Sequence, residues 1–247
     1  MPVFGQMTAS DWFNKGNELY FQERYNESIQ AYDRAIQINP QYESAWGNRG
    51  QAFEKLGKYS EALKAYDKAI EIDPQYVAAW NNKGNTLNSM GNFSEAIKCF
   101  DETMRLAPQI ASLILINKGF AYDEMKNYTE AIKCYDEAIK LNPQFEPAWS
   151  SKAGILYKLG KYSEAINCSD EAIRINPQSI AAWGNGAAAL NSTGRYDDAI
   201  ECYNEVIRLD PNDYVAWFNK GKALRALGRS SEAQKAFSKA EELGYNG

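Results

Sequence analysis

A pattern of 34 or 35 residues returns along this chain of 247 residues, and this repetition constrains the fold more than any other feature. Each copy begins with a large apolar residue, here called the lead residue. The lead residues are spaced by 34, 34, 35, 34, 34 and 34 positions: Trp12, Trp46, Trp80, Leu115, Trp149, Trp183 and Trp217. A period of this length is typical of stacked helix-turn-helix repeats, in which each repeat buries its apolar face only against its neighbours.

The second copy shows why each repeat should form two short antiparallel helices. Trp46, Gly50 and Phe53 are apolar or small and lie three or four positions apart, which places them on one face of a helix. Gly57 follows, and glycine suits the left-handed residue just past a helix end. A second apolar stripe of the same spacing runs on to Pro74, which disfavours helix in the residue before it.

These residues resemble the tetratricopeptide repeat family. The family pattern is present here as Trp46, Gly50, Phe53, Ala62, Tyr66, Ala69 and Pro74. The resemblance covers seven tandem repeats in a single solenoid over residues 9–247, after a leader of residues 1–8: 9–42, 43–76, 77–111, 112–145, 146–179, 180–213 and 214–247. It implies an all-α fold, an α-α superhelix that forms a right-handed solenoid. It also implies that the first helices line an inner groove and that the protein binds other proteins.

The charge and the apolar pattern exclude several classes of protein. The formal net charge is 27 − 32 = −5 and no basic run is present, so we expect no nucleic-acid partner. No stretch of about 18 apolar residues occurs, so we expect no membrane span. Residues 1–8 lack the basic start and long apolar run of a secretory signal, and the predicted location is the cytoplasm.

The chain has no histidine, which removes the commonest general base and the commonest metal ligand. No nucleophile–base set, metal-ligand cluster or phosphate-binding loop is visible either. The cysteines recur at one position of four successive repeats where other repeats have alanine, so we interpret them as small packing residues: Cys99, Cys134, Cys168 and Cys202. We therefore expect no enzymatic activity, no cofactor and no metal.

Amide side chains recur two residues after the lead residue. They form the series Asn14, Asn48, Asn82, Asn117, Ser151, Asn185 and Asn219, extended one turn further by Asn17, Gln51 and Asn85. Because an amide has donors and an acceptor, such a row can pair with successive peptide groups of an extended ligand. The row resembles the asparagine ladder in the repeat region of O-linked N-acetylglucosamine transferase. The alternative is that asparagine is simply common here in the family. A carboxylate clamp of the chaperone-adaptor type is excluded, because Phe13 and Ala78 occupy two of its basic positions.

The fourth repeat carries an apolar patch where the other repeats have polar residues or glycine. Its members are Leu113, Ile116 and Phe120, and one extra residue precedes them. We predict that the patch receives an apolar anchor of a partner. The alternative is that the extra residue rotates the helix and buries the patch in the stack.

Two further patterns concern packing. A cation three residues after the lead residue recurs with an aspartate in the second helix, as in Arg49 and Asp67, and predicts ion pairs within each repeat. Ser169 replaces the aromatic residue of the other repeats and predicts an underpacked fifth repeat. Gln234 and Glu241 replace apolar residues and predict a polar terminal cap.

The sequence therefore predicts a non-enzymatic scaffold that binds an extended peptide or short helix of a partner protein in its concave groove. The alternative is a self-assembly module, a homo-oligomer whose groove or ends are occupied by another copy. Neither interpretation includes a nucleic acid or a membrane as partner.

Overall fold

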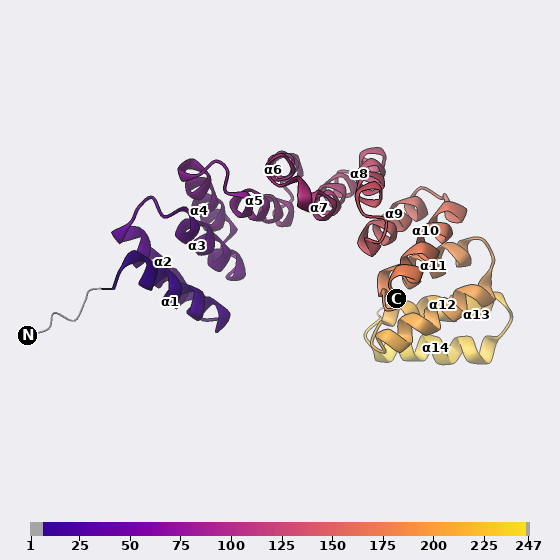
Figure 1. The fold of residues 1–247 in the computed structure, drawn as a ribbon. Helices are drawn as coiled ribbons and strands as arrows, with labels where there is room; N and C mark the ends of the chain where they lie inside the picture. The colour runs from indigo at the N-terminus through magenta and orange to yellow at the C-terminus, as the bar shows by residue number, and fades with distance from the viewer. Residues whose placement is uncertain (1–6, 246–247) are drawn as a thin grey trace, which may run out of the picture. The chain divides into compact units, whose positions relative to one another are not determined.

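The computed structural model describes residues 7–245, and within this range the chain is helical throughout and contains no strand (Figure 1). Two α-helices fall in each of the seven predicted repeats, which confirms the all-α fold of tandem helix pairs. Residues 1–6 of the predicted leader and residues 246–247 of the seventh repeat lie outside the described range.

The helix bounds follow the predicted repeats closely. The first helices of the seven repeats are α1 (Ala9–Phe21), α3 (Glu43–Lys55), α5 (Val77–Ser89), α7 (Ala111–Glu124), α9 (Glu146–Lys158), α11 (Ile180–Ser192) and α13 (Tyr214–Ala226). The second helices are α2 (Tyr25–Ile38), α4 (Tyr59–Ile72), α6 (Phe93–Leu106), α8 (Tyr128–Leu141), α10 (Tyr162–Ile175), α12 (Tyr196–Leu209) and α14 (Ser230–Glu242). No helix between residues 7 and 245 has the length and apolar character needed to cross a bilayer.

The chain divides into two compact units, Met1–Met125 and Lys126–Gly247. The first unit contains α1 to α7 and the second contains α8 to α14, so the fourth repeat contributes one helix to each. A single solenoid over residues 9–247 stays a prediction.

The turn inside a repeat depends on one residue in the left-handed region. In the second repeat this residue is Gly57, with φ of 70°. Its N–H donates to the carbonyl oxygen of Glu54 at 2.9 Å. The N–H of Lys58 donates to the carbonyl oxygen of Phe53 at 2.9 Å, and the two bonds close the end of α3. The first repeat makes the same turn with Glu23 at φ of 61°. A side chain in this conformation costs about 1 kcal/mol, which explains why glycine is preferred at this position.

An aromatic ring of the second helix packs on a glycine of the first helix in the second and third repeats. The rings of Tyr66 and Phe100 are fully buried. A Cβ atom at Gly50 would lie 2.5 Å from Cε1 of Tyr66, and one at Gly84 would lie 2.6 Å from Cε1 of Phe100. Glycine therefore makes room for the ring in these two repeats, and the prediction that these aromatic residues form core is confirmed.

Adjacent repeats pack through an apolar space that we call the socket. It lies between the lead residue, the residue seven positions later, and a small residue of the second helix. In the third repeat these are Trp80, Leu87 and Cys99, and Leu63 from α4 of the second repeat packs against them. The corresponding residues that fill the sockets of the fifth, sixth and seventh repeats are Ile132, Ile166 and Ile200. The side chain of one repeat thus completes the core of the next.

The cysteines are part of these cores. Cys99, Cys134 and Cys168 are buried, Cys202 is half-buried, and none of the four forms a disulfide. Burial raises the pKa of Cys99 and of Cys202 to about 11. These two thiols therefore stay protonated near neutral pH, and the burial of the cysteines agrees with their interpretation as packing residues.

The lead tryptophan also fixes the loop that precedes it. Its indole N–H donates to a proline carbonyl oxygen six residues earlier, from Trp46 to Pro40 at 3.1 Å and from Trp80 to Pro74 at 3.0 Å. The same bond recurs in the fifth, sixth and seventh repeats. Leu115 has no such donor, and a short 3-10 helix, Pro108–Ile110, occupies the longer loop before it.

The recurring cations and aspartates pair between repeats and not within them, so the predicted within-repeat pairing is wrong. Each cation reaches the aspartate of the preceding repeat. Nζ of Lys83 lies 2.5 Å from Oδ1 of Asp67, and Nε of Arg49 lies 2.7 Å from Oδ1 of Asp33. The remaining pairs of this kind are Lys118–Asp101 and Lys152–Asp136. The reason is that the first helix of one repeat packs on the second helix of the repeat before it, next to the socket.

The fifth repeat is not underpacked, so that prediction is also wrong. Ser169 is fully buried, and a Cβ atom at Gly186 in α11 would lie 3.2 Å from its Cβ. The backbone of the sixth repeat therefore occupies the space that an aromatic ring fills elsewhere. The hydroxyl of Ser169 has no hydrogen-bond partner within residues 7–245.

At the other end of the second unit, Gln234 and Glu241 of α14 are exposed to solvent. Their positions are those at which other second helices carry aliphatic residues that pack against the next repeat. The exposure agrees with the polar character of this face, and its role as a terminal cap stays a prediction.

Candidate functional site

The amide residues of the first helices form a row, here called the amide row, that lies on partly exposed helix faces. Within the first unit its members are Asn14, Asn17, Asn48, Gln51, Asn82, Asn85 and Asn117. The first helices α1, α3, α5 and α7 contact one another in this order, so the row continues from one repeat to the next. The structure therefore brings together the amide residues predicted in this part of the chain.

The row begins with an amide pair between the first two repeats. Nδ2 of Asn48 donates to Oδ1 of Asn17 at 2.8 Å. The same oxygen accepts from the hydroxyl of Tyr32 at 2.8 Å. Because both lone pairs of this oxygen are used, Asn17 links the two first helices to the core and is not available as an acceptor for a ligand.

A second amide pair links the third and fourth repeats. Nδ2 of Asn117 donates to Oδ1 of Asn85 at 3.0 Å, and Nδ2 of Asn88 donates to the carbonyl oxygen of Asn117 at 3.1 Å. The Oδ1 atoms of Asn88 and Asn81 are buried and accept no hydrogen bond within residues 7–245. This part of the row holds α5 and α7 together, a role that spacing in the sequence did not reveal.

Between these two pairs the amides have no internal partner. The side chains of Gln51 and Asn82 are half-buried and make no hydrogen bond with any residue of the range 7–245. The connection between α3 and α5 is made instead by Glu54. Its Oε2 accepts from the hydroxyl of Tyr66 at 2.9 Å and from that of Thr86 at 3.1 Å. Burial and the nearby carboxylate raise the pKa of Tyr66, which therefore remains a donor.

The apolar patch of the fourth repeat remains at the surface. Leu113 is 53% exposed and Phe120 is 46% exposed, whereas Ile116 is half-buried. The neighbouring residues Ile114 and Leu115 are buried and supply the packing of α7. The alternative interpretation, in which the extra residue turns the patch into the stack, is therefore wrong for Leu113 and Phe120.

The amide residues of the second unit behave differently. Nδ2 of Asn185 donates to the backbone carbonyl oxygen of Ser150 at 2.9 Å, which links α11 to α9. Ser151 and Asn219 are half-buried and make no side-chain hydrogen bond within the described range. Asn14 in the first unit is exposed and likewise has no partner there. Only part of the predicted row is thus open to a ligand.

The described residues offer polar and apolar groups for non-covalent contacts. Groups of three or more Cys, Asp and Glu side chains that could hold a metal ion are absent between residues 7 and 245. What the first unit offers is the unpaired amides of Gln51 and Asn82 on α3 and α5, and the exposed side chains of Leu113 and Phe120 on α7. Hydrogen bonds to peptide groups and one apolar contact are what such residues can supply.

Comparison with solved structures gives the same architecture. A tetratricopeptide repeat protein from Parabacteroides merdae is 20% identical, with a TM-score of 0.75 over 96% of this chain and 94% of that chain. YrrB, described as a TPR protein with an unusual peptide-binding site, is 20% identical, with a TM-score of 0.59 over 81% of this chain and 99% of that chain. The Cut9–Hcn1 hetero-tetramer of APC/C is 18% identical, with a TM-score of 0.73 over 97% of this chain and 46% of that chain. At these identities the likeness concerns the fold alone.

Sequence comparison identifies the repeats themselves. No curated protein matches the chain. The family described as tetratricopeptide repeat matches residues 44–76, 77–110, 112–145, 146–179 and 214–243, and the family described as TPR repeat matches residues 16–57 and 187–228. Together these matches cover most of the seven helix pairs. The chain therefore belongs to the tetratricopeptide repeat family.

Proposed function

We propose that this protein is an interaction scaffold that binds an extended peptide or short helical segment of a partner protein along the first helices of its first unit. Tetratricopeptide repeat proteins are in general protein-interaction scaffolds. The observation that carries the proposal is the pair of unpartnered amides, Gln51 and Asn82, on the helices that precede the exposed patch of α7.

The two features have complementary roles in this proposal. An amide presents two donors and one acceptor, so Gln51 and Asn82 can pair with the N–H and C=O groups of a peptide without reading its side chains. Leu113 and Phe120 can bury an apolar side chain of the same peptide, which supplies most of the binding free energy. The peptide-binding site named for YrrB, on a similar fold, supports a peptide as the ligand class.

Charge contributes little to this surface. Glu54, on the same helix as Gln51, already accepts two hydrogen bonds from the core. A peptide bound here meets few unpaired charges on α3 and α5. We therefore expect the dissociation constant to change little with salt concentration.

The test selects ligands without assuming their identity. A library of random peptides displayed on phage is selected on the full chain, and the dissociation constants of the selected peptides are measured by fluorescence anisotropy. The double variant Gln51→Ala with Asn82→Ala should weaken binding about thirtyfold, because each of the two lost amide contacts contributes about 1 kcal/mol. Phe120→Asp should weaken it by at least as much.

Two controls make the result interpretable. Gln75→Ala removes an exposed amide from the loop between the second and third repeats and should leave binding unchanged. Circular dichroism should show the same helicity and melting temperature for each variant, since the mutated side chains are not core. Selected peptides whose affinity is the same for wild type and for the double variant would contradict the proposal.

The self-assembly alternative gives a different result. Native mass spectrometry over a range of protein concentrations would then show dimers or larger species without any peptide. If Phe120→Asp abolished these species, the patch of α7 would be an interface between copies and not a peptide site.

A further inference from the structure

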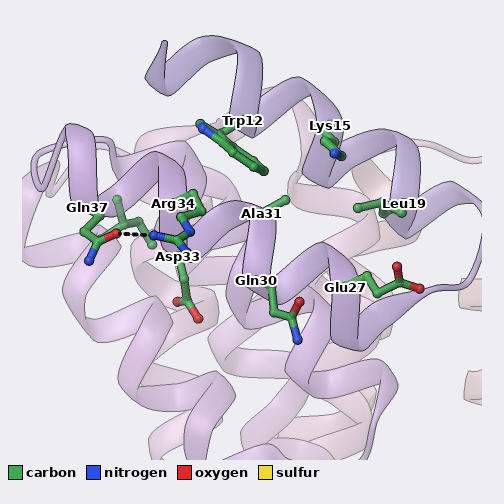
Figure 2. A pocket seen from close by; sticks show the side chains of 10 residues that line it. Trp12, Lys15, Leu19, Glu27, Gln30, Ala31, Asp33, Arg34 and Gln37 are labelled. Atoms are coloured by element: carbon green, nitrogen blue, oxygen red, sulfur yellow. Dashed lines mark hydrogen bonds between the residues drawn. The ribbon is translucent and has the colours of Figure 1, made fainter. Parts of the chain in front are cut away.

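The first repeat has a socket of the same construction as the internal ones, and no helix of residues 7–245 fills it. Figure 2 shows Trp12, Lys15 and Leu19 of α1 along one wall, with Ala31 and Arg34 of α2 on the other. These residues line an open pocket of about 710 Å³. Trp12, Leu19 and Ala31 occupy the positions that Trp80, Leu87 and Cys99 occupy in the filled socket of the third repeat.

The filled sockets show what chemistry this surface accepts. In the third repeat the occupant is Leu63, and Asp67 of the same helix pairs with Lys83 of the receiving helix at 2.5 Å. The acid follows the aliphatic residue by four positions, so both side chains lie on one face of the helix. The same arrangement recurs where Ile132 fills the socket of the fifth repeat and Asp136 pairs with Lys152 at 2.6 Å.

The empty socket has the cation that such a helix requires. Nζ of Lys15 lies over the Trp12 ring, 5.2 Å from its centroid, and forms no ion pair within residues 7–245. Arg34 donates only to Oε1 of Gln37 at 3.2 Å and likewise has no acidic partner in that range. The acids nearby already have partners: Glu27 pairs with Arg24, and Asp33 pairs with Arg49. Lys15 and Arg34 are therefore the two cations of this pocket that form no ion pair within residues 7–245, although Arg24 and, to a smaller extent, Lys15 lower the pKa of the Glu27 carboxyl.

We propose that the socket of the first repeat docks an amphipathic helix of a partner protein, one that carries a leucine or isoleucine and, four residues later, an aspartate or glutamate. The aliphatic side chain enters between Trp12, Leu19 and Ala31. The acid lies one helical turn further along and pairs with Lys15, as the internal aspartates pair with their cations. This surface shares no residue with the amide row, so the proposal does not rest on the peptide site.

A second copy of this chain does not match the socket. Its last helix, α14, has Gln234 and Ser238 where the internal second helices have the aliphatic residue and the aspartate. Neither residue can fill the apolar space or neutralise Lys15. The segment before the described range, MPVFGQ, contains no acid either. The occupant that fits is therefore a helix of another protein.

The probe for this proposal is a peptide of residues 59–72, YSEALKAYDKAIEI, which copies α4. An isolated helix of this length is marginal in water. A lactam that joins Glu61 to a lysine introduced by Ala65→Lys holds the peptide helical, on the face opposite Leu63 and Asp67. Binding of the fluorescently labelled peptide to the full chain is measured by anisotropy.

The expected result is saturable binding that depends on both features of the peptide. Leu63→Gln in the peptide should weaken binding about tenfold, because a buried aliphatic side chain contributes about 1.5 kcal/mol or more. Lys15→Glu in the protein should weaken it about threefold. The charge-swapped pair, protein Lys15→Glu with peptide Asp67→Lys, should recover most of that loss. A merely structural role of Lys15 would not give this recovery.

Controls separate this site from others. Lys64→Glu makes the same charge change at an exposed position of α4 and should leave binding unchanged, as should Phe120→Asp at the α7 patch. The proposal is overturned if the peptide does not bind, if Lys15→Glu has no effect, or if the charge swap restores nothing. It is also overturned if analytical ultracentrifugation shows dimers that Lys15→Glu dissociates, since a second copy would then be the occupant.

Discussion

The junction between the second and third repeats and the junction between the fifth and sixth repeats are packed in two different ways. In the first, the ring of Tyr66 fills the core and Lys83 pairs with Asp67 across the junction. In the second, Ser169 replaces the ring and Gly186 replaces the cation. Asp170 is still present at the position of Asp67, but Gly186 stands where Lys83 would pair with it.

The comparison shows that these replacements are one coupled change. A lysine at position 186 would crowd the close contact between α11 and Ser169, because its Cβ would lie 3.2 Å from the serine Cβ. With a ring at position 169, the backbone of α11 could not approach. The approach also explains why Asn185 reaches the backbone carbonyl of Ser150 at 2.9 Å, whereas Asn48 and Asn117 reach only side-chain oxygens of the preceding first helix.

The largest expected effect comes from removing the ring, but not the lysine, at the junction between the second and third repeats. Tyr66→Ser should lower the free energy of unfolding by about 3–5 kcal/mol, since it leaves a cavity that Lys83 prevents α5 from closing. It also leaves Glu54 with a single donor. Urea unfolding followed by circular dichroism measures the loss.

Adding Lys83→Gly to Tyr66→Ser completes the change and tests whether the two positions are coupled. We expect the double variant to lose less stability than the sum of the two single variants, because α5 can then move toward α4. Strict additivity would show that the close approach in the sixth repeat has another cause.

Most of the fold followed from the sequence because the period and the position of glycine and proline repeat in every copy. The sequence did not predict which residues form ion pairs across the junction between adjacent repeats. Lys83 could pair with Asp67 before it or with Asp101 after it, and spacing alone does not choose between them. The exceptions pointed to the wrong choice: the sixth repeat lacks both the cation and the acid, at Gly186 and Asn204, which favours pairs within a repeat. Pairing between repeats instead leaves Asp170 opposite Gly186 and Lys220 opposite Asn204.

The candidate site was predictable only in outline. The sequence places amides on one face of the first helices, and it marks Leu113 and Phe120 as unusual for that face. It does not say which amides are used internally. Whether Asn48 reaches Asn17, or Asn82 remains without a partner, depends on small differences in the distance between adjacent helices, and no residue pattern encodes those distances directly.

A smaller effect is expected when the ring is placed in the irregular junction. Ser169→Tyr should lower the free energy of unfolding by about 1–3 kcal/mol, because the ring must push α11 away from α10. Thermal unfolding of the variant and of wild type measures the difference. Ser169→Ala is the matched control and should be neutral or slightly stabilising, since the hydroxyl has no hydrogen-bond partner among residues 7–245. A more stable Ser169→Tyr variant would mean that a void exists there after all.

The smallest expected effect is a difference between neutralising Asp67 and neutralising Asp170. Asp67→Asn should lower the free energy of unfolding by about 0.5 kcal/mol, because it removes an exposed ion pair with Lys83. Asp170→Asn should raise the free energy of unfolding by a similar or smaller amount near neutral pH. Partial burial raises the pKa of Asp170 above its ordinary value of 3.8, so the folded state disfavours its ionised form.

The dependence on pH gives the sign of the Asp170 effect independently. Since the folded pKa is the higher one, the cost of ionising Asp170 first appears as the pH rises through 3.8 and is complete above the folded pKa. The gain from Asp170→Asn should therefore be present near neutral pH and vanish as the pH falls to about 3.8. Urea unfolding of both variants and wild type at these two pH values measures this. If Asp170→Asn instead destabilised the protein near neutral pH, Asp170 would have a cationic partner, and the two junctions would differ less than their packing indicates.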